Sequence, residues 1–328
     1  MRPLTHGLRS VLSIGTEHRD MHSFWAVFNH MKELYDARII DKRTVIAYET
    51  FPQVPEMLRN PFFSKGGKFD EKSFFEAMAT THRSIDDIEK TMVQVPLGNP
   101  YFRMNMFEMI KYANLAEFSK QTKIPLIELD NSDVTKRMDA LMDQRAKEAK
   151  SRQELEFQQE KIVRMFERER VGNMVKNVIE QTYRAPTENV IAFVGGAHLP
   201  TLQHGLGQAF EGVNYVSRHL LSGQGCFEMM QGQIADYNEA GKQCQKYLQE
   251  SCEDHLKDAG CSDILQQFPL KFDFVQERSR DGEPILSEAL RQEIYSAFRG
   301  PSISPKPSGD NSKSPLDSEK SGAQGSGR

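Results

Sequence analysis

The sequence predicts a three-layer α/β domain with a mostly parallel central sheet, helices on both faces and helical insertions. Short apolar runs rich in β-branched residues, such as residues 44–50 and 190–194, are typical of strands buried on both faces. The segments between such runs carry apolar residues at helical spacing. The first two strands lie within about 45 residues with one helix between them, and such a βαβ unit implies parallel strands and a right-handed crossover.

Each element follows from a local pattern. We expect strands at residues 9–15, 44–50, 124–130, 190–194 and 213–217, with a late edge strand at 271–275. The carboxylate of Asp20 can accept N–H bonds from the first turn of the helix that follows it, in which Phe24, Phe28 and Met31 share an apolar face.

The remaining helices are predicted from composition. Residues 134–184 contain helix formers and no glycine or proline except Gly172, which predicts a long helical segment. Residues 226–265 are expected to be helical, and residues 53–120 helical with loops. These helices cover the sheet and supply the insertions.

Composition limits the classes of function. The net charge of −4 and pI near 6.2 give no electrostatic case for nucleic acid. No apolar run approaches the ~20 residues that span a bilayer, and the N-terminus lacks the separate apolar region and cleavage site of a secretory signal. We expect a cytoplasmic protein, or one exported without a conventional signal. Its domain covers residues 1–298, and residues 299–328 form a disordered Ser/Pro/Gly-rich tail.

Four cysteines lie in the C-terminal third, at Cys226, Cys244, Cys252 and Cys261, and no pair has the C-x-x-C spacing of a zinc ribbon. Reduced structural thiols are the default interpretation. A metal site that uses Cys252, His255 and Cys261 is the alternative.

Two strand ends carry the same pattern. Apolar runs lead into Gly15-x-x-His18 and, 180 residues later, Gly195-x-x-His198. Ligands of open α/β sheets bind beyond the carboxyl ends of the strands, so the fold brings these two histidines together. Glu49 ends the second strand, and Arg170 lies in the helix before the second histidine.

This ordered set resembles the erythromycin esterase, TraB/Tiki and ChaN-like superfamily. The matching features are the two Gly-x-x-His turns, the glutamate at a strand end and the Arg-x-x-x-Met helix of Arg170 and Met174, across roughly residues 10–210. The family often has Asp or Asn directly after this arginine, where this chain has Val171. The hydrogen bond of such a residue is therefore lost here or comes from elsewhere.

The resemblance implies a hydrolase of ester or amide bonds, with two possible chemistries. In the first, His18 is a general base held by Glu49, while Arg170 and His198 stabilise oxyanion charge. In the second, His18, Glu49 and His198 bind Zn²⁺, Mn²⁺ or Co²⁺ and leave a position for water. The substrate is then a small molecule or a peptide.

Further residues are candidates by position. Glu17, His22 and Asn173 are predicted to contact substrate, and Glu128 and Asp130 to line the cleft. Each also has a structural alternative, because histidines at tight turns are often simply hydrogen-bonded and a buried glutamate needs a partner in any case.

Two other functions remain open. ChaN-like members of the superfamily are associated with haem iron, which a histidine pair can ligate. Toxin and effector proteins also carry this fold, and in that role the chain would act on a host protein after delivery. The sequence does not give the oligomeric state.

Overall fold

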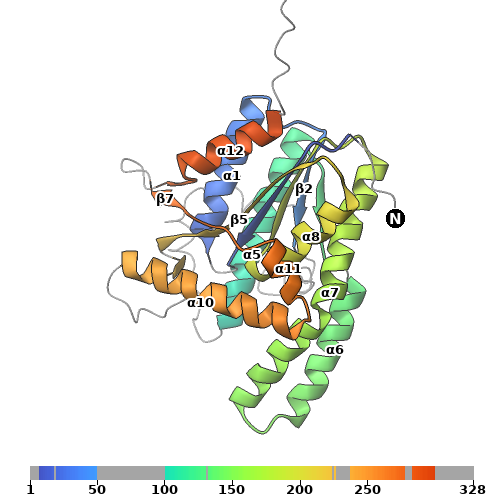
Figure 1. Cartoon of the computed structure of the whole chain (residues 1–328), viewed down its shortest axis with the longest axis vertical. Helices are drawn as coiled ribbons and strands as arrows, with labels where there is room; N and C mark the ends of the chain where they lie inside the picture. The colour runs from blue at the N-terminus through green and yellow to red at the C-terminus, as the bar shows by residue number, and fades with distance from the viewer. Residues whose placement is uncertain are drawn as a thin grey trace, which may run out of the picture.

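The computed structural model describes residues 7–17, 20–49, 100–130, 132–223, 225–226, 237–277 and 283–299. Its centre is a six-stranded sheet of order β3-β2-β4-β1-β5-β6, in which all neighbouring strands run parallel (Figure 1). Helices cover both faces, so the predicted three-layer α/β class is confirmed.

The strands lie close to their predicted places. They are β1 Ser10–Thr16, β2 Thr44–Tyr48, β3 Leu126–Glu128, β4 Asn189–Gly195, β5 Asn214–Leu221 and β6 Phe272–Phe274. β5 runs four residues beyond its predicted end because Arg218–Leu221 continue to pair with neighbouring strands, which brings His219 into the sheet. β6 is the edge strand that the sequence predicted.

One face of the sheet packs against α1 (Met21–Asp36), α5 (Pro100–Thr122) and α12 (Glu288–Arg299). Asp20 caps α1 as predicted, since its Oδ1 accepts a hydrogen bond from Ser23 N at 3.0 Å. α12 was not predicted, although its buried residues recur every four positions. This helix seals the end of the apolar layer.

The other face packs against α7 (Arg152–Arg184) and α8 (Leu199–Ala209), with α6 (Ser132–Glu148) beside α7. Residues 134–184 are helical as predicted, but a break that was not predicted divides them into α6 and α7, which form a helical hairpin (Figure 1). Ser151 accepts a hydrogen bond from Glu154 N at 3.1 Å, and the Glu154 carboxylate returns to Lys150 N at 2.9 Å. This Ser-x-x-Glu sequence resembles a capping box and starts a new helix without glycine or proline.

Alternation along β2 decides which way its last residues point. Ile46 and Tyr48 belong to the apolar layer on the α1 side, and Ala47 belongs to the layer on the α7 side. Glu49, next after Tyr48, therefore follows Ala47 toward α7. This parity places the glutamate opposite Arg170.

The C-terminal part adds α10 (Tyr237–Asp258), α11 (Ser262–Gln267) and a small antiparallel pair, β7 (Gln276–Glu277) with β8 (Pro284–Ile285). α10 crosses the lower end of α7 (Figure 1). Among the described residues, no helix is both long enough and apolar enough to span a membrane. The predicted helices at 53–99 and the tail from residue 300 onward lie outside the described residues.

Candidate functional site

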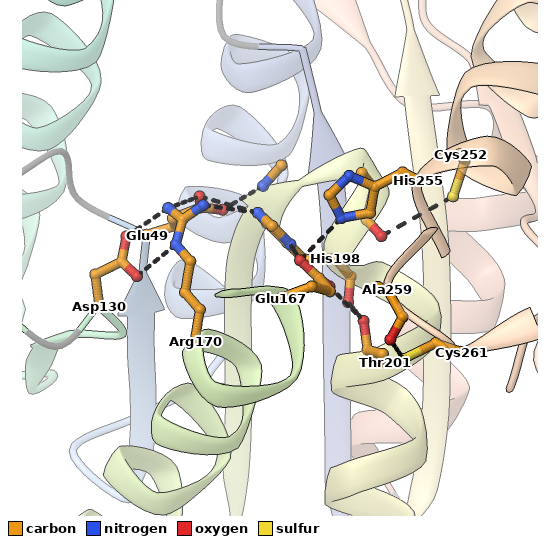
Figure 2. A network of polar contacts seen from close by, with 12 residues as sticks. Glu49, Asp130, Glu167, Arg170, His198, Thr201, Cys252, His255, Ala259 and Cys261 are labelled. Atoms are coloured by element: carbon orange, nitrogen blue, oxygen red, sulfur yellow. Dashed lines mark hydrogen bonds and ion pairs between the residues drawn. The ribbon is translucent and has the colours of Figure 1, made fainter. Parts of the chain in front are cut away.

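Arg170 is the centre of a buried network at the carboxyl edge of the sheet (Figure 2). Its Nη2 donates to Glu49 Oε1 at 2.5 Å and to Asp130 Oδ2 at 2.7 Å, and its Nε donates to Asp130 Oδ1 at 2.9 Å. The guanidinium thus joins the ends of β2 and β3. Burial works against its charge, but Glu49 and Asp130 outweigh that effect and raise the pKa of Arg170.

Glu49 is fixed by both carboxylate oxygens. Oε1 faces Arg170, and Oε2 accepts a hydrogen bond from Gly195 N at 2.5 Å. The side chain is 3% exposed. A buried carboxylate needs this degree of pairing, and the partner expected for Glu49 is Arg170.

His198 lies at the turn between β4 and α8, where residues Gly196–His198 form one turn of 3-10 helix. Its Nδ1 lies 2.7 Å from Glu167 Oε2, and its Nε2 lies 3.0 Å from Arg170 Nη1 and 3.5 Å from Glu49 Oε1. Burial disfavours the imidazolium, but the charges of Glu167 and Glu49 outweigh it and raise the pKa of His198 to about 10.

Arg170, in contrast, favours the neutral form of the His198 ring. An arginine N–H can only donate, so its contact with Nε2 fits the neutral tautomer with a bare Nε2. In both protonation states a proton lies on Nδ1 and faces Glu167. The constant feature of the site is therefore an N–H donor on Nδ1 that faces Glu167.

Glu167 joins the first histidine to a second one. Its Oε2 lies 3.0 Å from His255 Nε2 on α10, and its Oε1 accepts a hydrogen bond from Thr201 on α8 at 2.7 Å. The carboxylate is fully buried. Burial would raise its pKa, but His198 and His255 outweigh this and lower it.

Glu167, His198 and His255 have the spacing of metal ligands. One ligand atom from each lies within 4.8 Å of the other two, and all three residues are buried. Within the described part of the chain this is the one group of three or more His, Cys, Asp or Glu with that spacing. Figure 2 shows it as the continuation of the Arg170 network toward α10.

The predicted catalytic residues fall into two groups. Glu49, Arg170 and His198 come together as expected. His18, predicted as general base and metal ligand, lies outside the described residues. Its place beside Glu49 and His198 stays a prediction.

No described contact connects the residues predicted to bind substrate, Glu17, His22 and Asn173, to the Arg170 network. Glu17 lies at the end of β1, with Oε1 3.1 Å from His219 Nε2. His22 is half-buried in the first turn of α1, and Asn173 is half-buried on α7, three residues after Arg170. Glu128 ends β3, where one Oε receives a 3.4 Å contact from Tyr112. Asp130, by contrast, is one of the main partners of Arg170.

The alternative set of Cys252, His255 and Cys261 does not form in the described structure. His255 points to Glu167, whereas Cys252 Sγ lies 3.9 Å from Ala197 O and Cys261 Sγ lies 3.2 Å from Arg168 Nε. All four cysteines are free and buried. The reduced thiols that the sequence predicted are the arrangement present here.

Val171 packs into the core on the α7 side and is 3% exposed. The position next to Arg170 therefore serves the apolar layer. Arg170 has a polar partner in Asp130, whose carboxylate receives two hydrogen bonds from it.

Sequence reasoning missed Glu167 and Thr201, and it considered His255 only together with Cys252 and Cys261. Glu167 has a signal, because residues 167, 170, 171, 174, 175 and 178 follow helical spacing and all are buried. His255 has no comparable signal, since its role depends on how α10 crosses α7.

The fold and the site were compared with protein-family models, curated proteins and solved structures, and none of the three comparisons finds a match.

Proposed function

We propose that this chain is a hydrolase of ester or amide bonds. The observation that carries the proposal is the buried network of Glu49, Arg170, His198 and Glu167 at the carboxyl edge of a parallel sheet. This edge is where α/β enzymes bind ligands, and clusters of groups with shifted pKa values are concentrated at functional sites.

Two adjacent positive groups suit hydrolysis. Arg170 Nη1 and His198 Nε2 are 3.0 Å apart. The carboxylates of Glu49 and Asp130 bind Arg170, and the carboxylate of Glu167 binds His198. Fixed positive groups stabilise the negative charge that develops on oxygen when water attacks an ester or amide. In this proposal Arg170 and His198 take that role, and Glu49 and Asp130 position the guanidinium.

The haem alternative is less well supported by the same geometry. A haem needs open space of porphyrin size in front of the ligating nitrogen. His198 is buried and lies among the side chains of Glu167, Arg170 and Glu49, which leave no such space in the described structure. No described contact favours the effector alternative.

The test is turnover by the purified full chain on chromogenic esters of increasing acyl length and on fluorogenic peptides. His198→Gln is the diagnostic variant, and we expect it to reduce kcat/KM by at least about 100-fold, the usual effect of losing one charge-stabilising donor. His204→Gln is the matched control, since His204 is on α8 and contacts Gln208, outside the network. Absence of turnover by the folded wild type, or equal turnover by wild type and His198→Gln, would refute the proposal.

A further inference from the structure

We propose that Glu167, His198 and His255 bind one Zn²⁺ ion. The inference deepens the proposed function, because a bound ion would supply the attacking water, although binding itself can be tested without any turnover. The set differs from the His18, Glu49 and His198 set that the family resemblance implies. It shares only His198 with that set and takes its other two ligands from α7 and α10.

The ligand atoms are identified by their contacts. Thr201 occupies Glu167 Oε1, so Oε2 is the oxygen that faces both imidazoles. It lies 2.7 Å from His198 Nδ1 and 3.0 Å from His255 Nε2. Bonds of about 2.0–2.2 Å in a tetrahedral site place ligand atoms roughly 3.3 Å apart. The ion therefore enters with outward shifts of a few tenths of an ångström.

Charge favours the ion. Glu49, Asp130 and Glu167 are three carboxylates and Arg170 is one guanidinium, and their side chains are at most 9% exposed. With neutral imidazoles, these described side chains sum to a net charge of −2, and a divalent cation brings that sum to zero. Uncompensated buried charge is strongly unfavourable. A Zn²⁺ ion at Nδ1 replaces the proton that the site holds between His198 and Glu167.

The groups around the ligands are those of a metal site. Ligation through Nδ1 puts the remaining proton of His198 on Nε2, and Glu49 Oε1, 3.5 Å away, is its acceptor. Such a carboxylate behind a ligating histidine fixes the ring and increases its basicity. Arg170 Nη1, now 3.0 Å from Nε2, has to move away from the ring in that state, because two N–H donors cannot share one hydrogen bond.

Two imidazoles and one carboxylate suit Zn²⁺, and three protein ligands leave a fourth position for water. Zinc lowers the pKa of bound water to about 7, which provides the nucleophile of a hydrolase. A surface hollow of about 340 Å³ is lined in part by Arg164 and Asp258, and none of the three ligands lines it. Arg164 and Asp258 lie one helical turn from Glu167 and His255 and pair at 2.6 Å.

The experiment is a zinc titration of the full chain after treatment with a chelator, followed by calorimetry and by elemental analysis of the dialysed protein. We expect one ion per wild-type chain and loss of that ion in His255→Gln and in Glu167→Gln. Thr201→Val keeps the shape but releases Oε1, and we expect it to weaken binding by about 10–100-fold. His204→Gln and Cys252→Ser are matched controls that should bind as the wild type does.

Melting curves separate loss of the site from loss of the fold. Saturating zinc should raise the Tm of the wild type and of His204→Gln, and leave the Tm of His255→Gln unchanged. Cobalt provides a second readout, since its visible spectrum distinguishes nitrogen and oxygen ligands from thiolate. Substoichiometric zinc, binding unchanged in His255→Gln, or a thiolate spectrum would overturn the inference.

The outcomes also separate this inference from the proposed function. One ion per chain without turnover on any ester or peptide would leave the metal site standing and remove the hydrolase. Turnover by a zinc-free chain that Glu167→Gln does not change would leave the hydrolase and remove the metal site.

Discussion

Replacement of Arg170 by glutamine tests whether the charged network also holds the fold together. The wild-type guanidinium makes three hydrogen bonds to carboxylates, at 2.5, 2.7 and 2.9 Å, and a fourth contact to His198 at 3.0 Å. Glutamine removes the charge and leaves Glu49 and Asp130 buried without it. Loss of one partner of a buried ion pair costs about 3–5 kcal/mol.

Two opposing effects set the size of the loss of stability. Hydrogen bonds to charged groups contribute about 1.5–3 kcal/mol each, which for three bonds would exceed that range. The carboxylates of the variant can take up protons instead, at about 1.4 kcal/mol for each unit by which their pKa rises. We therefore expect Arg170→Gln to lower the free energy of unfolding by about 4 kcal/mol at pH 7. A domain has roughly 5–15 kcal/mol in total.

The loss should shrink in acid. Without Arg170, burial raises the folded-state pKa of Glu49 and Asp130 above the unfolded values near 4. A carboxyl whose pKa is raised on folding destabilises the protein once the pH rises through that pKa. The deficit of the variant is therefore largest at neutral pH and smaller at pH 5.

The assay is urea unfolding followed by circular dichroism at pH 7 and pH 5. Arg43→Gln is the matched control, because Arg43 also bonds two carboxylates, Asp41 and Glu188, but on the exposed surface. Exposed pairs contribute little, so this variant should hardly change. A loss below about 1 kcal/mol for Arg170→Gln, or a loss equal at both pH values, would refute the reasoning.

Two further predictions concern backbone space and buried charge. A Cβ at Gly196 would lie 1.9 Å from His219 Cε1, so we expect Gly196→Ala to lower the free energy of unfolding by about 2–3 kcal/mol. A Cβ at Gly172 meets nothing within 4 Å, so Gly172→Ala should raise the free energy of unfolding by roughly 1 kcal/mol. Urea unfolding midpoints measure both changes. Burial lowers the pKa of His30 although Glu33 opposes it, so the wild type should lose stability as the pH falls below the unfolded value near 6.5. His30→Gln should lose less stability than the wild type between pH 7 and pH 5.5, as measured by urea unfolding midpoints. Equal shifts of the midpoint in the wild type and in His30→Gln would contradict this.

The central strands β1, β2 and β4 were predictable because they are buried along almost their whole length. The ends of β1 and β4 lie in register, with Thr16 opposite Gly195. Local sequence thus fixes both the strands and the edge where ligands bind. The division between α6 and α7 was harder to predict, since its signal is the Ser151 and Glu154 cap rather than a glycine or proline.

Two of the site residues were predictable because they follow strand ends. Glu49 comes directly after β2 and His198 three residues after β4, so topology places them near each other. Arg170 was predicted from the family resemblance, through the Arg-x-x-x-Met pattern of its helix. Glu167 sits in a charged helix whose exposed residues obscure the pattern of its buried face. His255 is distant in sequence and reaches Glu167 only because α10 crosses α7, which depends on tertiary packing that no local pattern encodes.

The carboxyl edge of the sheet is fixed from both faces, and the proposed catalysis would depend on this. On the α1 side, Tyr48 donates a short hydrogen bond to Glu108, and Glu108 pairs with the buried Lys111 at 3.0 Å. Lys111 in turn donates to the carbonyl of Glu17 at 3.4 Å, at the end of β1. Glu49, the residue after Tyr48, ties the same edge to α7.

Tyr48 and Glu49 point to opposite faces of the sheet, so a charged network on each face is attached to the same end of β2. Electrostatic catalysis needs donors that are held before the substrate arrives, because reorientation during the reaction would cost the energy that they supply. Charged groups packed on both faces provide that rigidity, whereas a network on one face would leave the strand end free to tilt. We therefore expect the α1-side network to affect turnover through the position of Glu17 and Glu49, without contact with the reacting atoms.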